Sequence, residues 1–212
     1  MKSMKLYILR HGETNWNTRH LFQGQTNTNL NDAGISQAKA CRERVREMGL
    51  TFDYVVSSPL DRALTTASIV SGLPKESIPT DKRLMEMNFG ALDATPFTAE
   101  SPLANTLLNH PSKYVAGPGA ETYEQVIARA DSFFADMAKT RPGESVLVGA
   151  HGCIMRCMLV DLGYLDLDEI WHQGIGNCTI IEAELDGEKG KFHVVRIDET
   201  RDFVHTTAKT KE

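Results

Sequence analysis

Cysteine is scarce in this 212-residue chain, and long apolar runs are missing from it. The four cysteines form no CxxC pair and lie in apolar stretches, so we expect reduced, buried thiols and no disulfide framework: Cys41, Cys153, Cys157 and Cys178. Before Arg10 the N-terminus offers only a short apolar run, which is too short for a secretory signal. No stretch approaches the ~18 apolar residues of a membrane span. These absences predict a cytoplasmic protein with no membrane partner.

The chain also lacks an excess of basic residues. It has 23 Lys and Arg against 28 Asp and Glu, a net charge of -5. This balance argues against a nucleic-acid partner, so any site for an anion must be local. The length allows a core that needs neither a metal nor a disulfide. We expect one domain over residues 1–212 and leave its oligomeric state open, a homo-oligomer included.

Three short apolar runs are typical of strands buried on both faces, because each is continuous and stops at a turn. They cover residues 6–9, 54–56 and 146–148. Near the end of the chain, residues 178–185 and 192–197 flank a glycine-containing turn, which predicts an antiparallel hairpin. The last residues, about 203–212, are expected to fray.

Helical spacing of apolar residues separates the predicted strands. The expected helices cover residues 35–48 with Asn31 as cap, residues 60–70 with Ser58 as cap and Pro59 in the first turn, and residues 123–137 with a Thr122–Gln125 capping box. Strands that alternate with such helices predict an α/β fold, a sheet with parallel members and helices on both faces.

Residues 92–121 differ from the rest of the chain, since they contain four of its eight prolines and only short apolar clusters. A segment of this length without regular structure is usually functional. We expect a small cap built from helical and loop pieces over a ligand site.

Basic residues and glycines follow the three predicted parallel strands. Arg10 and His11 end the first, Arg62 lies just after the second, and His151 and Gly152 follow the third. Because the carboxyl ends of parallel strands meet at one edge of a sheet, these groups are expected to surround one ligand. Guanidinium groups and helix N-termini suit a phosphoryl group better than a carboxylate or a metal.

A histidine beside two arginines is suited to more than binding. Nearby positive charge disfavours the imidazolium form, which leaves a ring nitrogen of His11 free to attack phosphorus. His151 and the arginines would stabilise the phosphoryl oxygens during transfer. Glu86 lies among apolar residues, where its pKa should rise as a proton donor to the leaving group requires.

Four motifs in order, Leu9–Thr14, Ser57–Ala63, Glu86 before Phe89–Gly90, and His151–Gly152, resemble the histidine phosphatase superfamily, in its phosphoglycerate-mutase-like branch. The resemblance spans residues 6 to about 180. It implies a three-layer α/β/α sandwich with a mostly parallel mixed sheet and a small cap. It also implies His11 as phosphorylated nucleophile, Glu86 as proton donor, and a phosphate pocket made of Arg10, Asn17, Gln23, Gly24, Arg62, His151 and the Gly152 amide. No metal or other cofactor is invoked.

The resemblance leaves hydrolysis and phosphoryl transfer as alternatives. The true mutases have paired arginines in the cap that hold a second anionic group, whereas residues 92–121 of this chain contain no arginine and one lysine, Lys113. We therefore favour a metal-independent phosphomonoesterase acting on a small phosphorylated metabolite, with a phosphoglycerate mutase as the alternative. A binding module without catalysis is a third hypothesis. The apolar residues of the cap suggest that it tolerates neutral or partly apolar leaving groups: Phe97, Leu103, Leu107, Leu108 and Tyr114.

Overall fold

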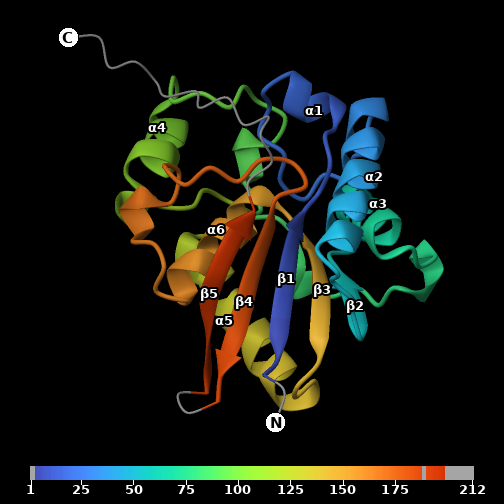
Figure 1. The fold of residues 1–212 in the computed structure, drawn as a ribbon. Coiled ribbons are helices and arrows are strands. Elements are labelled where there is room, and N and C mark those ends of the chain that lie inside the picture. The colour runs from blue at the N-terminus through green and yellow to red at the C-terminus, as the bar shows by residue number, and fades with distance from the viewer. Residues whose placement is uncertain (1–2, 188–189, 199–212) are drawn as a thin grey trace.

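The computed structural model describes residues 3–187 and 190–198, which form a five-stranded sheet flanked by helices (Figure 1). The strand order is β2-β3-β1-β4-β5. In this sheet, β1 and β2 run parallel to β3, while β4 is antiparallel to both β1 and β5. The bounds are Lys5–Arg10 for β1, Tyr54–Ser57 for β2, Ser145–Ala150 for β3, Ile180–Asp186 for β4 and Lys191–Asp198 for β5.

The two faces of the sheet each carry a hydrophobic core, which explains the continuous apolar sequence of β1. Leu6 and Ile8 belong to one core, and Tyr7 and Leu9 to the other, because successive side chains of a strand point to opposite faces. Helices α2 (Asp32–Glu47) and α3 (Asp61–Ser71) pack on one face, and α5 (Tyr123–Thr140) and α6 (Gly152–Asp161) pack on the other (Figure 1). The predicted three-layer α/β/α fold with a mixed sheet is confirmed.

The predicted starts of α2 and α5 are confirmed. The side chain of Asn31 accepts a hydrogen bond from the N–H of Gly34, and Thr122 and Gln125 form the expected capping box. The predicted cap of α3 is wrong. That helix begins after Leu60 with no side-chain cap.

Residues 92–121 lie at the end of the sheet where β1 and β3 finish, together with the short helix α1 (Asn15–Thr18) (Figure 1). They contain α4 (Pro102–Asn109) and a 3₁₀ turn at Pro111–Lys113. Leu107 and Tyr114 are buried in the core beside α5, whereas Phe97 is 40% exposed. Leu107 and Tyr114 therefore belong to the core, and the tolerance of this segment for apolar leaving groups stays a prediction.

Two glycines bring the loop after β1 against the first turn of α2. A Cβ on Gly12 would lie 2.5 Å from the carbonyl oxygen of Gly34, and a Cβ on Gly34 would lie 2.1 Å from the carbonyl oxygen of Glu13. Both distances are far below any real contact, so the two backbone segments touch only because neither glycine has a side chain.

In the part of the chain that the structure describes, no helix is long and apolar enough to cross a membrane. The tail expected to fray, about residues 203–212, lies outside the described residues.

Candidate active site

The carboxyl ends of β1 and β3 bring two histidines and two arginines together. Arg10 is the last residue of β1, His151 follows β3, and the ring centroids of His11 and His151 are 5.3 Å apart. Arg62 reaches the same place from the first turn of α3, since side chains on a helix lean toward its N-terminus. The charges of both arginines lower the pKa of each histidine, so the four side chains are close enough to interact electrostatically.

His11 is buried and has one free ring nitrogen. Its Nδ1 lies 2.7 Å from the carbonyl oxygen of Gly12. Because a carbonyl oxygen only accepts, Nδ1 carries the hydrogen and Nε2 keeps its lone pair. Burial lowers the pKa of His11 well below its usual value of 6.5, and the charges of Arg62 and Arg10 lower it further. The side chain is thus an uncharged imidazole with an unprotonated Nε2.

His151 presents the opposite arrangement, because its Nε2 is the occupied nitrogen. Nε2 lies 2.8 Å from the hydroxyl oxygen of Ser58, which itself accepts the N–H of Leu60. The hydroxyl hydrogen of Ser58 is available for Nε2, and when Ser58 donates it the ring hydrogen of a neutral His151 lies on Nδ1. Burial, followed by Arg62 and His11, lowers the pKa of His151 well below 6.5. Ser58, which lies just before the start of α3, therefore orients the ring of His151.

Four buried side-chain nitrogens at this place have no hydrogen-bond partner among the described residues. They are Arg10 Nε, Gln23 Nε2, Arg62 Nε and His151 Nδ1. Buried polar groups in proteins are nearly always paired, and leaving one unpaired costs about 1–3 kcal/mol. Four donors from different chain segments without an acceptor define a site for a group rich in oxygen atoms and negative charge.

The remaining nitrogens of the two arginines hold the backbone around the site. Arg62 donates to the carbonyl oxygens of Thr26 and Gly24 at 2.9 and 2.7 Å, and Arg10 donates to that of Ile175 at 2.5 Å. Burial is the first cause that lowers the pKa of each guanidinium, in both cases to about 10. Both groups are therefore fixed in place with their Nε atoms unpaired.

Glu86 lies beside the start of α6. Its carboxylate accepts three backbone N–H groups at 2.9 Å, those of Met87, Cys153 and Ile154. The flanking residues in the sequence are apolar, but their backbone amides and the helix N-terminus face the carboxylate. Glu86 is buried, in keeping with the expected apolar neighbourhood, but its three backbone donors were not predicted from the sequence.

Three other expected ligand contacts are placed as follows. The amide oxygen of Asn17 accepts the N–H of Thr14 at 3.0 Å, as part of a capping box, so only its NH₂ group is left for a ligand. The N–H of Gly24 donates to Asp93 at 2.8 Å. Gly152 is the first residue of α6, and a Cβ there would lie 3.4 Å from Arg10 Nε, so glycine leaves the space beside that donor open.

Two residues near the site were not predicted from the sequence. Arg156, one turn after Gly152 on α6, is 7% exposed and donates to the carbonyl oxygens of Gly152 and Gln173. Asn177 donates from Nδ2 to the carbonyl oxygen of His11 at 2.9 Å. The signal for Arg156 was present, since it is the one charged residue in the apolar stretch 153–160. Asn177 lies in irregular chain and gave no such signal.

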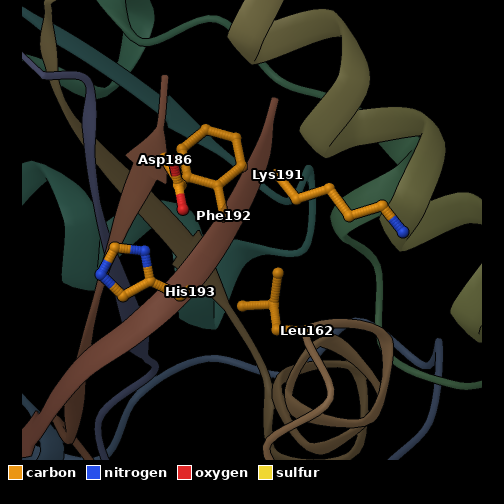
Figure 2. A pocket seen from close by; sticks show the side chains of 5 residues that line it. All are labelled: Leu162, Asp186, Lys191, Phe192 and His193. Carbon is orange, nitrogen blue, oxygen red and sulfur yellow. The ribbon is translucent and has the colours of Figure 1, made fainter. Parts of the chain in front are cut away.

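A cavity of about 500 Å³ lies elsewhere, at the opposite end of the sheet (Figure 2). It is lined by Leu162, just after α6, by Asp186 at the end of β4, and by Lys191, Phe192 and His193 at the start of β5. The end of β4 lies beside the start of β1, whereas His11 follows the end of β1. The cavity is therefore separate from the histidine site. Within residues 3–187 and 190–198, no group of three or more His, Cys, Asp or Glu side chains could hold a metal ion.

Comparison with known proteins defines the class. The sequence pattern of the histidine phosphatase superfamily (branch 1) matches residues 6–198, so the chain belongs to this superfamily. A Hydrogenobacter thermophilus protein named phosphoserine phosphatase 2 is 30% identical over 190 residues, 87% of this chain and 91% of that protein. A Yersinia pestis protein named phosphoglycerate mutase GpmB is 29% identical over 184 residues, 85% of each chain.

Among solved structures, the mycobacterial glucosyl-3-phosphoglycerate phosphatase in complex with VO3 is similar, with a TM-score of 0.75 and 26% sequence identity. The match covers 90% of this chain and 96% of that one. The predicted family and fold are both confirmed.

Proposed function

We propose that this protein hydrolyses small phosphate monoesters through a phosphohistidine at His11, without a metal ion. The observation that carries the proposal is the combination of an uncharged His11 imidazole with four buried, unpartnered nitrogens from the segments that converge on it. The superfamily and the relatives named as phosphatases support a hydrolase of the histidine phosphatase type.

The reaction has two displacements at phosphorus. In the first, Nε2 of His11 forms a bond to phosphorus while the bond to the ester oxygen breaks, and Glu86 supplies the proton that the departing alcohol needs. In the second, water attacks the phosphohistidine, gives its proton to the Glu86 carboxylate, and releases inorganic phosphate with a free His11. The enzyme ends in its starting state, with one water consumed.

The positive groups stabilise charge on the phosphoryl oxygens as they pass from one partner to the other. Arg10, Arg62 and Gln23 contribute their unpaired N–H donors, and the Nδ1 hydrogen of His151 contributes a fourth. The amide of Gly152 lies at a helix N-terminus, where an anion is favoured. Asn17 is proposed as a weaker contact from the loop side through its NH₂ group, whereas the N–H of Gly24, also expected as a contact, is taken by Asp93. Two guanidinium groups perform the charge neutralisation for which other phosphatases use metal ions.

A mutase is the second candidate, because the relative named phosphoglycerate mutase covers most of the chain. Mutase activity requires a second anionic group to be held while the phosphoryl group changes position. The proposed cap, residues 92–121, offers only Lys113 for that purpose. We propose hydrolysis on this ground, within a single cytoplasmic domain.

The test is a screen of phosphate esters in a buffer that contains EDTA, with release of inorganic phosphate as the measurement. Hydrolysis predicts released phosphate that EDTA does not reduce, and no conversion between 2- and 3-phosphoglycerate in the presence of bisphosphoglycerate. Interconversion without net phosphate release would instead establish the mutase. Loss of activity in EDTA with recovery on added metal would contradict the metal-independent mechanism.

The nucleophile is tested with His11→Ala. This variant should lose turnover by about 10⁴-fold or more, because the attacking atom is absent. It should also fail to acquire an acid-labile, base-stable label when substrate labelled in the phosphoryl group is quenched during turnover. Circular dichroism controls for folding. A folded variant with activity near that of the unmodified protein would refute the assignment.

A further inference from the structure

An ion pair outside the phosphate site holds the backbone on both sides of Glu86. Arg129, on α5, donates from Nε and Nη2 to the two carboxylate oxygens of Glu121, at 3.0 and 3.1 Å. Their side chains are only 15% and 22% exposed. A two-point pair of this kind fixes orientation as well as distance. The pair connects α5 to the last residue of the proposed cap.

Both members of the pair bind the Glu86 segment, which we define as residues 85–88. The third nitrogen of Arg129, Nη1, donates to the carbonyl oxygen of Met85 at 2.6 Å. Glu121 accepts the backbone N–H of Asn88 at 2.8 Å through Oε2, and its own N–H donates to the carbonyl oxygen of Asn88 at 2.9 Å. The segment is therefore gripped one residue before Glu86 and two residues after it.

A third contact ties the same pair to the phosphate side. The side-chain NH₂ of Gln25 donates to the carbonyl oxygen of Glu86 at 3.1 Å and to Oε2 of Glu121 at 3.4 Å. Gln25 follows Gly24, whose carbonyl oxygen Arg62 holds. Gln25 therefore connects both the Glu86 peptide and the Glu121 carboxylate to the neighbouring Gly24, which Arg62 holds.

These contacts determine where the Glu86 carboxylate lies. Its three N–H donors come from the start of α6 and from Met87 within the gripped segment. They fix the carboxylate only while the segment keeps its place against α6. Proton transfer depends on a donor held within hydrogen-bond reach of the leaving oxygen, and a displacement of about 1 Å can cost about 10²-fold in rate.

We propose that Glu121 and Arg129 are positioning residues for proton donation by Glu86. The proposal rests on the proposed function, in which Glu86 protonates the leaving group. Neither residue touches the phosphoryl group. Their loss leaves the phosphate donors and His11 in place but lets the donor carboxylate move away from the leaving oxygen.

The leaving group provides the test. Esters of alcohols need the donated proton, because an alkoxide is a poor leaving group. In contrast, p-nitrophenyl phosphate needs it far less, because p-nitrophenolate is a stable anion at neutral pH. We would measure kcat/KM for a series of substituted phenyl phosphates and one alkyl phosphate, and plot log(kcat/KM) against the pKa of the leaving alcohol or phenol. The ratio kcat/KM reports the first chemical step, which includes departure of the leaving group.

Glu121→Gln and Arg129→Lys should steepen this plot relative to the unmodified protein. We expect a loss of about 10-fold or more on the alkyl ester and about 2-fold or less on p-nitrophenyl phosphate. The matched control is Asp136→Asn. It removes the 2.8 Å ion pair between Arg83 and Asp136, which also ties α5 to the chain just before the Glu86 segment, and it should leave the slope unchanged.

The slope separates positioning from a loss of folded protein, because fewer active molecules lower kcat/KM equally for all substrates. The positioning role is wrong if Glu121→Gln and Arg129→Lys lower kcat/KM by the same factor for every substrate. It is also wrong if they leave kcat/KM unchanged for all substrates. Glu86→Gln separates this failure from failure of the proposed function. It must itself steepen the slope, with about 10²-fold or greater loss on the alkyl ester. A parallel plot for Glu86→Gln would mean that Glu86 is not the proton donor.

Discussion

The charged side chains along the central sheet are paired differently at its two ends. At the start of β1, Lys5 pairs with Glu182 at 3.1 Å and with Glu184 at 3.7 Å, and Arg196, level with the middle of β1, pairs with Glu182 at 3.2 Å. At the end where β1 finishes, Arg62 is buried and Arg10 is partly buried, and the Nε atoms of both are buried and unpaired. In the first set, buried Glu182 is paired with two partly exposed cations.

This difference bears on how a candidate site is recognised in this protein. The cavity of about 500 Å³ lies at the start of β1, whereas the unpaired donors of the candidate site lie at the other end. Unpaired buried donors from several chain segments are therefore a stronger guide than free volume, because buried polar groups are mostly paired with protein or ordered water. Three predictions test this comparison.

The largest effect is expected for Arg62→Lys. Lysine keeps the charge but loses the planar group that holds two carbonyl oxygens and still presents Nε to the ligand. We expect kcat/KM for hydrolysis to fall by about 10²–10³-fold. Arg196→Lys, on the edge strand β5, is the matched control and should change kcat/KM by less than about 2-fold. Equal losses in the two variants would break the comparison.

An intermediate effect is expected on stability at acidic pH. His11 and His151 have pKa values lowered below 6.5 in the folded protein, so below pH 6.5 the unfolded chain binds more protons. The free energy of unfolding must then fall as the pH falls, by up to about 1.4 kcal/mol per pH unit for each histidine. Urea unfolding between pH 7.5 and 5 in phosphate-free buffer measures this slope.

His151→Gln should remove about half of that contribution to the slope. The control His20→Asn changes an exposed histidine with a φ of +50°, a conformation that asparagine tolerates, and should leave the slope as it is. A slope that does not respond to His151→Gln would show that the buried histidines do not resist protonation.

The smallest effect is expected for Lys5→Ala, which breaks the ion pairs at the start of β1. Partly exposed ion pairs contribute about 0–1 kcal/mol, so the free energy of unfolding should change by no more than this and kcat/KM should stay within about 2-fold. Thermal unfolding and the phosphate-release assay measure both. A loss of activity near that of Arg62→Lys would mean that the two ends of the sheet are coupled.

Much of the molecule could be predicted from the sequence because its signals are local. Continuous apolar runs identified β1, β2 and β3, and the capping box identified the start of α5. Parallel strands then required Arg10, His11, Arg62 and His151 to meet at one edge, and the structure brings these side chains together. Their catalytic roles remain predictions.

The remainder depends on contacts between distant residues, which the sequence does not encode locally. The backbone amides around Glu86 come from the start of α6, more than sixty residues away along the chain. Asn177 holds the carbonyl oxygen of His11 from an irregular segment. The cap of α3 was mispredicted because Ser58 binds His151 as well as lying near the helix, and a propensity rule does not see a tertiary partner.

The contact between Gly12 and Gly34 has a consequence for how variation in this chain should be interpreted. Any side chain at position 34 must push the backbone of Glu13 aside, and with it the turn that orients the imidazole of His11. A saturation mutagenesis survey scored by catalysis would therefore place Gly34 among the intolerant positions, although it lies in a helix and never meets the substrate. Intolerance there reports the shape of the backbone beside His11, the proposed nucleophile.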